Sequence, residues 1–143
     1  LATDSSSRTS VMLARILLVL EAIADHRDLG HGQRAHDGRV IAATRLMTED
    51  PAREWSLDLL AEQTASSASH LLRLFRRDLG LAPIAWLARY RAERLAVLLL
   101  TSEHTIAELG AQVGWPEPSY CARRFRACFG LSPAMFRAGH AEK

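Results

Sequence analysis

The sequence predicts an all-α protein, with about seven helices in a main domain and one further apolar helix near the N-terminus. Apolar residues recur three and four positions apart in successive segments, which is the period of a helix. These segments begin at capping residues and end at Gly or just before Pro. No segment alternates apolar and polar residues in the manner of a strand. With 143 residues, of which 48% are hydrophobic and 24% are charged, the chain is long enough for one domain with a proper core and a helical arm.

One basic amphipathic segment occurs twice. Residues 69–83 read SHLLRLFRRDLGLAP, and residues 119–133 read SYCARRFRACFGLSP. At this single offset Arg73 aligns with Arg123, and both copies end in Gly followed three residues later by Pro. A short apolar helix pattern precedes each copy. Helix, sharp turn and basic helix is the order of a helix-turn-helix, so the sequence predicts two such units.

The helices and their caps are expected as follows. Helices are predicted, in chain order, over residues 11–24, 38–49, 57–64, 68–79, 84–100, 106–112, 118–129 and 133–139. The predicted N-caps are Ser10, Asp37, Ser56 and Ser67, and Thr105 with Glu108 forms a capping box. Pro118 suits the first position of its helix, and Gly114 suits the turn before it. The run 95–100 is nearly all apolar and is expected to be central.

We divide the chain into two parts. Residues 37–140 are expected to form the main domain, with one helix-turn-helix at about 56–80, a linker helix at about 84–100 and a second helix-turn-helix at about 105–130. Residues 1–36 hold a polar lead-in, the apolar helix 11–24 and a polar linker. A helix this apolar must bury its surface, against the rest of the chain or against a second copy in a homodimer, and both options stay open. Because the first residue is Leu, we expect the chain to be a fragment.

Several classes of site find no support in the sequence. His26, His31 and His36 lie in a polar linker without the i, i+4 helical pair typical of zinc, so neither a metal nor another cofactor is expected. The chain lacks a nucleophile elbow and a phosphate loop, so no enzyme activity is expected. Cys121 and Cys128 lie two turns apart on one helix, too far for a disulfide, which predicts reduced, partly buried thiols in a cytoplasmic protein. No run reaches the roughly 20 apolar residues of a membrane span, so no membrane partner is expected.

The charge is unevenly distributed, although the net charge is only +2. Residues 66–94 contain six Arg against two acidic residues, and residues 120–137 contain four Arg and no acidic residue. A solvated charged helix face would explain either run alone. Two basic runs in equivalent places favour a polyanion as the partner.

In each basic helix the apolar stripe is expected to face the core and the Arg side chains the solvent. The predicted stripes are Leu71, Leu74 and Phe75 in the first helix, and Cys121, Phe125, Cys128 and Phe129 in the second. The residues expected to contact double-stranded DNA are Ser67, Ser69, His70, Leu72, Arg73, Arg76, Arg77, Pro118, Ser119, Tyr120, Arg123, Arg124 and Arg126. Arg73 and Arg123 lie one turn into their helices, where a helix in the major groove presents side chains to guanine. Arg76, Arg77 and Arg126 lie nearer the helix ends, which favours phosphate contacts.

A set of motifs runs through residues 37–140. It consists of Trp55-Ser56-Leu57, Leu60-Ala61, Ser67 with HLLRLFRRDLGLAP, Arg91, Leu98-Leu99, Ile106, Val113-Gly114-Trp115 and SYCARRFRACFGLSPAMFR. By these motifs and their spacing, residues 37–140 resemble the DNA-binding domain of the AraC/XylS family of bacterial transcription regulators. The resemblance implies a homeodomain-like arrangement of seven helices and operator binding that recruits or blocks RNA polymerase. In this family an effector-binding domain usually precedes the DNA-binding part, so a small-molecule effector is expected only if such a domain precedes this chain.

The sequence departs from the family pattern at several positions. Leu72 offers no hydrogen bond to a base, so whether the first helix-turn-helix reads bases or only binds phosphates stays open. Ala65 stands in the first turn where the family favours Gly, Gly110 stands where Ala is usual, and Cys121 stands where an aromatic residue is common. A helical protein-interaction module that has lost specific DNA binding remains the alternative to a DNA-binding regulator. The outward Arg residues of both repeats distinguish the two, because a pure interaction module does not require them.

Overall fold

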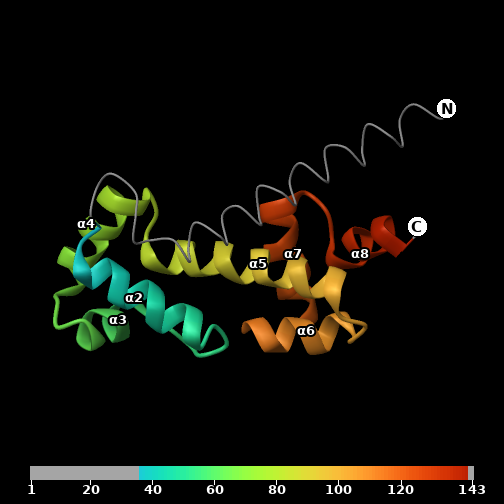
Figure 1. The fold of residues 1–143 in the computed structure, drawn as a ribbon, viewed down its shortest axis with the longest axis horizontal. Coiled ribbons are helices and arrows are strands. Elements are labelled where there is room, and N and C mark those ends of the chain that lie inside the picture. Colours follow the sequence, from blue (N-terminus) through green and yellow to red (C-terminus); the bar gives the residue numbers. More distant parts are fainter. Residues whose placement is uncertain (1–35, 142–143) are drawn as a thin grey trace. The chain divides into compact units, whose positions relative to one another are not determined.

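The computed structural model describes residues 36–141, which form seven helices and no strand, as predicted (Figure 1). The helices are α2 (Gly38–Glu49), α3 (Leu57–Gln63), α4 (Ala68–Leu79), α5 (Pro83–Thr101), α6 (Ile106–Val113), α7 (Pro118–Phe129) and α8 (Pro133–Ala141). The predicted apolar helix 11–24, its cap Ser10, and His26 and His31 lie outside the described residues.

Local capping signals determine where the helices begin. The side chains of Asp37, Ser56 and Ser67 accept backbone N–H bonds at the starts of α2, α3 and α4, as predicted. Thr105 and Glu108 form the predicted capping box of α6. The bounds of α2, α4 and α7 agree with the sequence expectation, and those of the other helices differ by one or two residues at an end.

The first core lies among α2, α3, α4 and the first turns of α5. Its fully buried members include Val40, Met47, Leu60, Leu71, Phe75 and Leu87. The predicted stripe of α4 is therefore confirmed, since Leu74 is buried as well. Trp55 also packs into this core, and its Nε1 donates to the Asp50 carbonyl at 2.8 Å. This bond holds the connection between α2 and α3 against the core.

The second core lies between the later turns of α5 and helices α6, α7 and α8. Its buried residues are Leu95, Ala96, Leu99, Leu109, Val113, Trp115, Cys121, Phe125, Phe129 and Phe136. The ring of Phe125 stacks on Phe129 with centroids 4.8 Å apart and meets Phe136 edge-on at 5.4 Å. Aromatic contacts of this kind join α7 to α8.

Two expectations about burial are wrong. Cys128 is exposed, because α7 buries a stripe of residues four apart and Cys128 lies on the flank of that stripe. Leu100 is 36% exposed although its run was expected to be central. The reason is that the later turns of α5 bury only one face, while the opposite face meets solvent.

Helix α5 contributes buried side chains to both cores. Its 19 residues span about 28 Å at 1.5 Å per residue. Trp86 and Leu87 near its start are part of the first core, whereas Leu95 and Leu99 are part of the second. Figure 1 shows α2–α4 toward one end of α5 and α6–α8 toward the other. The length and stiffness of this helix therefore control the separation of the two basic helices, α4 and α7.

Candidate nucleic-acid interface

The turn that leads into α4 contains a strained residue. Ala65 has φ 51, in the left-handed region, and the N–H of Ser66 donates to the Ala61 carbonyl at 2.9 Å. A residue with a Cβ pays roughly 1–2 kcal/mol in this conformation, which explains why Gly is favoured here. The departure at Ala65 therefore leaves strain in the turn that orients α4.

α4 presents a basic face to solvent. Its exposed residues are those predicted from the repeat, namely Ser69, Arg73, Arg76 and Arg77, with the exposed N-cap Ser67 just before them. His70 and Leu72 are half-buried. The opposite side of α4 is packed into the first core, so this face is the one that the helix can offer to a partner.

His70 lies between two guanidinium groups. Arg39 of α2 approaches Nε2 of His70 through Nη1 at 3.1 Å, and Arg73 approaches Nδ1 through Nη2 at 3.4 Å. A neutral imidazole has only one acceptor nitrogen, so it accepts from one of the two Arg residues at a time. Sequence reasoning missed Arg39 as a member of this face, because nothing local relates it to a helix 31 residues away.

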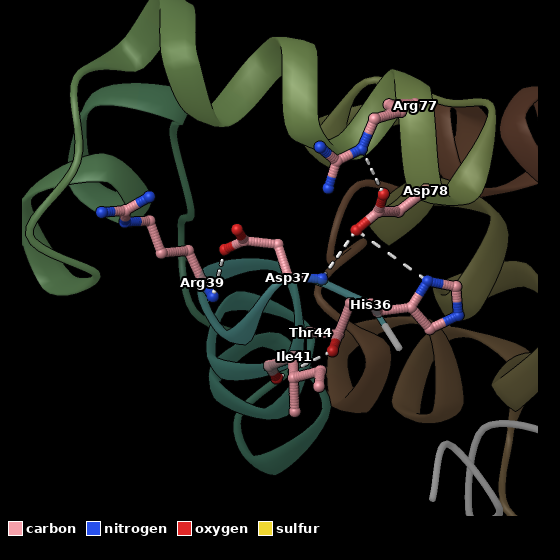
Figure 2. Close-up of polar contacts among 7 residues, drawn as sticks. All are labelled: His36, Asp37, Arg39, Ile41, Thr44, Arg77 and Asp78. Atoms are coloured by element: carbon pink, nitrogen blue, oxygen red, sulfur yellow. Dashed lines mark hydrogen bonds and ion pairs between the residues drawn. The ribbon is translucent and has the colours of Figure 1, made fainter. Parts of the chain in front are cut away.

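Arg77 is partly engaged within the protein. Its Nε donates to Oδ1 of Asp78 at 2.7 Å, and Oδ2 of Asp78 accepts the backbone N–H of Asp37 at 2.8 Å (Figure 2). The hydrogen bond from Arg77 lowers the pKa of the Asp78 carboxyl, and the same bond raises the pKa of Arg77. Because only Nε is used and the Arg77 side chain is 63% exposed, its terminal nitrogens stay available for a phosphate.

The turn between α6 and α7 is built on two glycines. Gly114 has φ 97, as predicted from its place in the turn, and the N–H of Trp115 donates to the Gly110 carbonyl at 2.8 Å. A Cβ on Gly110 would lie 2.9 Å from the Trp115 carbonyl oxygen and 3.1 Å from Sγ of Cys121. The two family departures at 110 and 121 therefore occur in contact, and the missing Cβ lets α7 pack closely on α6.

α7 presents the second basic face. The predicted contact residues Pro118, Ser119, Tyr120, Arg123 and Arg126 are among its exposed residues, whereas Arg124 is half-buried. The guanidinium of Arg123 lies 5.4 Å from the centre of the Tyr120 ring, within the range of a cation–π contact. Tyr120 thus restrains Arg123, the residue that corresponds to Arg73 in the repeat.

Glu117 caps the start of α7, which sequence reasoning did not foresee. Its carboxylate accepts the backbone N–H groups of Tyr120 at 2.6 Å and of Ser119 at 3.0 Å. These bonds, the one from Tyr120 foremost, lower the pKa of Glu117. The signal in the sequence was an acidic residue directly before Pro118, because Pro suits the first helical position and a negative charge is favourable at a helix N-terminus. As a result, the first amides of α7 are occupied by a protein carboxylate.

Arg137 belongs to the second basic run of the sequence, yet the structure uses it internally. Its guanidinium donates to the carbonyls of His104 at 2.7 Å, Ser102 at 3.0 Å and Leu99 at 3.4 Å. These carbonyls lie at the end of α5 and in the loop that follows. Arg137 therefore ties α8 to the end of α5, and the basic face of the second unit depends on the Arg residues of α7.

Two other classes of site are absent from the part of the chain that the structure describes. Residues 36–141 contain no group of three or more His, Cys, Asp or Glu placed to hold a metal ion. None of the helices among these residues is long and apolar enough to cross a bilayer.

Comparison with known proteins agrees with this geometry. A family model described as a helix-turn-helix domain matches residues 60–139. The arabinose operon regulatory protein of Escherichia coli (strain K12) is 34% identical over 108 residues, which are 75% of this chain and 37% of that protein. The chain therefore spans little more than a third of the length of this relative. By name the relatives are mainly transcription regulators, which gives no support to a pure protein-interaction module.

Two solved structures share the fold at 27% sequence identity. The C-terminal domain of AraT, a response regulator from Geobacillus stearothermophilus, has a TM-score of 0.70 and covers 73% of this chain and 88% of its own. The DNA-binding domain of the global transcriptional factor AdpA, solved in complex with a target DNA, has a TM-score of 0.69. The match covers 73% of this chain and 94% of the AdpA chain. The family match, the relatives and the seven-helix fold together show that the chain belongs to the AraC-type helix-turn-helix family of DNA-binding transcription regulators.

Proposed function

We propose that residues 37–140 form the DNA-reading domain of a bacterial transcription regulator, which inserts α4 and α7 into successive major grooves of an operator. The observation that carries this proposal is the paired placement of Arg73 and Arg123. Each lies one turn into an exposed helix whose opposite side is buried in its own helix-turn-helix core. The major groove admits one helix and is read by side chains from its first turns.

The exposed residues divide by chemistry into base-reading and phosphate-binding groups. Arg73 and Arg123 are assigned to guanine, because the guanidinium fork matches O6 and N7 of that base. Arg76, Arg77, Arg124 and Arg126 are assigned to phosphates, and Arg39 joins them from α2. The remaining contacts are assigned to Ser67, Ser69, His70, Leu72, Pro118, Ser119 and Tyr120. Among these Leu72 has no polar atom in its side chain, so it contributes only apolar contact.

The spacing of the two helices follows from α5. Two recognition helices about 34 Å apart enter successive major grooves on one face of the duplex. The 19-residue α5, about 28 Å long, is shared by both cores and supplies a separation of this order. The domain would thus recognise two half-sites about one helical turn apart.

The wider role in the cell extends this proposal. We assign the chain to the cytoplasm, where its operator binding recruits or blocks RNA polymerase, and we assign the segment 11–24 to contacts with a second copy. A small-molecule effector is part of this proposal only if an effector-binding domain precedes these residues. Sedimentation of the full chain tests the dimer: a monomer at tens of micromolar removes that part of the proposal.

Fluorescence anisotropy tests the central claim. The full chain is titrated onto the DNA upstream of its own gene and onto a scrambled duplex of equal composition, across a salt series. We expect tighter binding to the upstream DNA and a steep loss of affinity with salt, because phosphate contacts release counterions. Equal affinity for both duplexes would contradict sequence reading, and no binding to either duplex at low salt would contradict the whole proposal.

A further inference from the structure

Arg91, in the middle of α5, contacts the connection between α2 and α3 through two hydrogen bonds. Its Nε donates to the carbonyl of Pro51 at 2.8 Å, and its Nη2 donates to the carbonyl of Arg53 at 2.9 Å. Both carbonyls lie in the connection between α2 and α3, about 40 residues earlier in the chain. The carbonyl of Arg53 also accepts the N–H of Trp55, which is anchored in the first core.

The same guanidinium lies against the second unit. A Cβ on Gly114 would be 2.9 Å from Cζ, from Nε and from Nη2 of Arg91, so the guanidinium occupies the space beside this glycine. Gly114 is the left-handed residue of the turn between α6 and α7. The guanidinium of Arg91 thus donates hydrogen bonds to the connection between α2 and α3. It also packs against the turn between α6 and α7, which orients α7.

The surroundings of Arg91 suit a fixed group better than a mobile one. The side chain is half-buried, and burial lowers its pKa, an effect partly offset by Tyr120 of α7. A guanidinium holds its donors in one rigid plane, so the two carbonyls determine its orientation, whereas an ammonium on a flexible stem would leave the plane undefined. Without this group the two units would be joined chiefly through α5, and small bends of a long helix would change their relative orientation.

We propose that Arg91 is a positioning residue that locks the second helix-turn-helix unit in one orientation relative to the first, and thereby sets the half-site spacing that the protein accepts. The part of this inference that concerns spacing rests on the proposed function. The part that concerns orientation does not, so the two can fail separately.

The orientation is tested without DNA. Spin labels are placed on the native exposed Cys128 of α7 and on a cysteine introduced by Ser69→Cys on α4, and the distribution of distances between them is measured by electron–electron double resonance. Cys121 is buried and is expected to stay unlabelled, which intact mass confirms. We expect Arg91→Ala to broaden the distribution and Arg91→Lys to broaden it less. The matched control is Arg94→Ala, an exposed arginine on the same helix, which should leave the width unchanged.

The spacing is tested with the unlabelled full chain. A duplex selected by the wild-type protein from a random library is altered by adding or removing one base pair between its half-sites. Each base pair displaces the second half-site by about 3.4 Å along the duplex, so that it no longer lies opposite α7. The wild-type protein should therefore lose about tenfold or more in affinity. For Arg91→Ala we expect weaker binding at the original spacing, and a further loss of only about twofold in affinity when one base pair is added or removed. Arg94→Ala should show the same loss on the altered spacing as the wild type.

An unchanged distance distribution in Arg91→Ala would overturn the inference about orientation. A broader distribution accompanied by an unchanged loss of affinity on altered spacing would overturn the inference about half-site spacing. A simple stabilising role for Arg91 predicts the first of these results together with a lower melting temperature. If the wild-type protein selects no DNA, the proposed function and the spacing claim fail together, and the distance distribution alone decides the orientation claim.

Discussion

Arg77 and Asp78 are adjacent in sequence and are joined by a hydrogen bond of 2.7 Å between Nε and Oδ1, while Oδ2 of Asp78 holds the backbone N–H of Asp37 at the start of α2. Asp78, at the end of the basic helix α4, therefore stabilises the start of α2, as the dashed lines in Figure 2 show. The Asp78 side chain is only 8% exposed. The charge of Arg77 contributes to this contact and to the basic face at once.

Replacing Asp78 should destabilise the first unit. Asp78→Ala leaves the N–H of Asp37 without its acceptor and is expected to lower the free energy of unfolding by about 1–3 kcal/mol. Asp78→Asn keeps an oxygen for Asp37 and should cost less. Urea titration followed by circular dichroism measures both, and an alanine variant as stable as the wild type would contradict the role of this bond.

The same carboxyl predicts a dependence on pH. Its pKa is lowered in the folded protein, chiefly by the hydrogen bond from Arg77, so its contribution is fully present above the unfolded pKa of about 4. The contribution is lost as pH falls through the lower folded pKa. Between pH 5 and pH 2 the wild-type protein should therefore lose more stability than Asp78→Asn, and parallel curves for the two proteins would rule this out.

Substitutions of Arg123 and of Arg76 are expected to reduce DNA binding in different ways. Arg123→Ala should cost about 1–3 kcal/mol on the selected site and relax the preference at one base position. Arg76→Ala should weaken binding to all duplexes alike and reduce the slope of affinity against salt by about one. Anisotropy on single-base variants of the site measures both effects. Equal losses on the selected and scrambled duplexes for Arg123→Ala would make it a phosphate contact.

The space at Gly110 predicts the effect of adding one methyl group. Gly110→Ala places a Cβ 2.9 Å from a backbone oxygen, which must shift, and it is expected to cost about 1–3 kcal/mol. Gly38→Ala is the matched control, since a Cβ there meets nothing within 4 Å at the start of α2. That variant should be neutral or slightly more stable, because Ala is the better helix former. Thermal melts separate the two, and similar melting temperatures would contradict the close contact of α6 and α7.

The strained turn before α4 predicts a stabilising substitution. Ala65→Gly removes the left-handed penalty at φ 51 but gives the unfolded chain more freedom, so the net gain is expected to be about 0.5 kcal/mol. Chemical denaturation measures this difference. A loss of stability would show that the side chain of Ala65 contributes more than its backbone strain costs.

The aromatic core residues that the repeat aligns should each support their own unit. Phe75→Ala and Phe125→Ala remove fully buried rings and are expected to cost about 3–5 kcal/mol each. Thermal unfolding followed by circular dichroism reports the loss, and an unchanged melting temperature for either variant would contradict the assignment of that ring to a core.

Local features of the sequence were sufficient for the helices of the described region. Caps such as Ser67 and Thr105 act on amides within three residues, and the stripes of α4 and α7 repeat every three or four residues, so both can be read without knowing the fold. The same patterns placed Arg73 and Arg123 on exposed helix faces, and the structure confirms their exposure. Their contacts with DNA remain a prediction.

Contacts between distant parts of the chain were decided only by tertiary structure. Arg91 reaches carbonyls about 40 residues earlier, Arg137 reaches carbonyls 33 to 38 residues earlier, and Arg39 meets His70 across 31 residues. In sequence all three read as ordinary basic residues, because a charge pattern does not say which Arg will find an acceptor. That depends on how the helices cross, and helix crossing depends on the complete shape of both cores rather than on any local period.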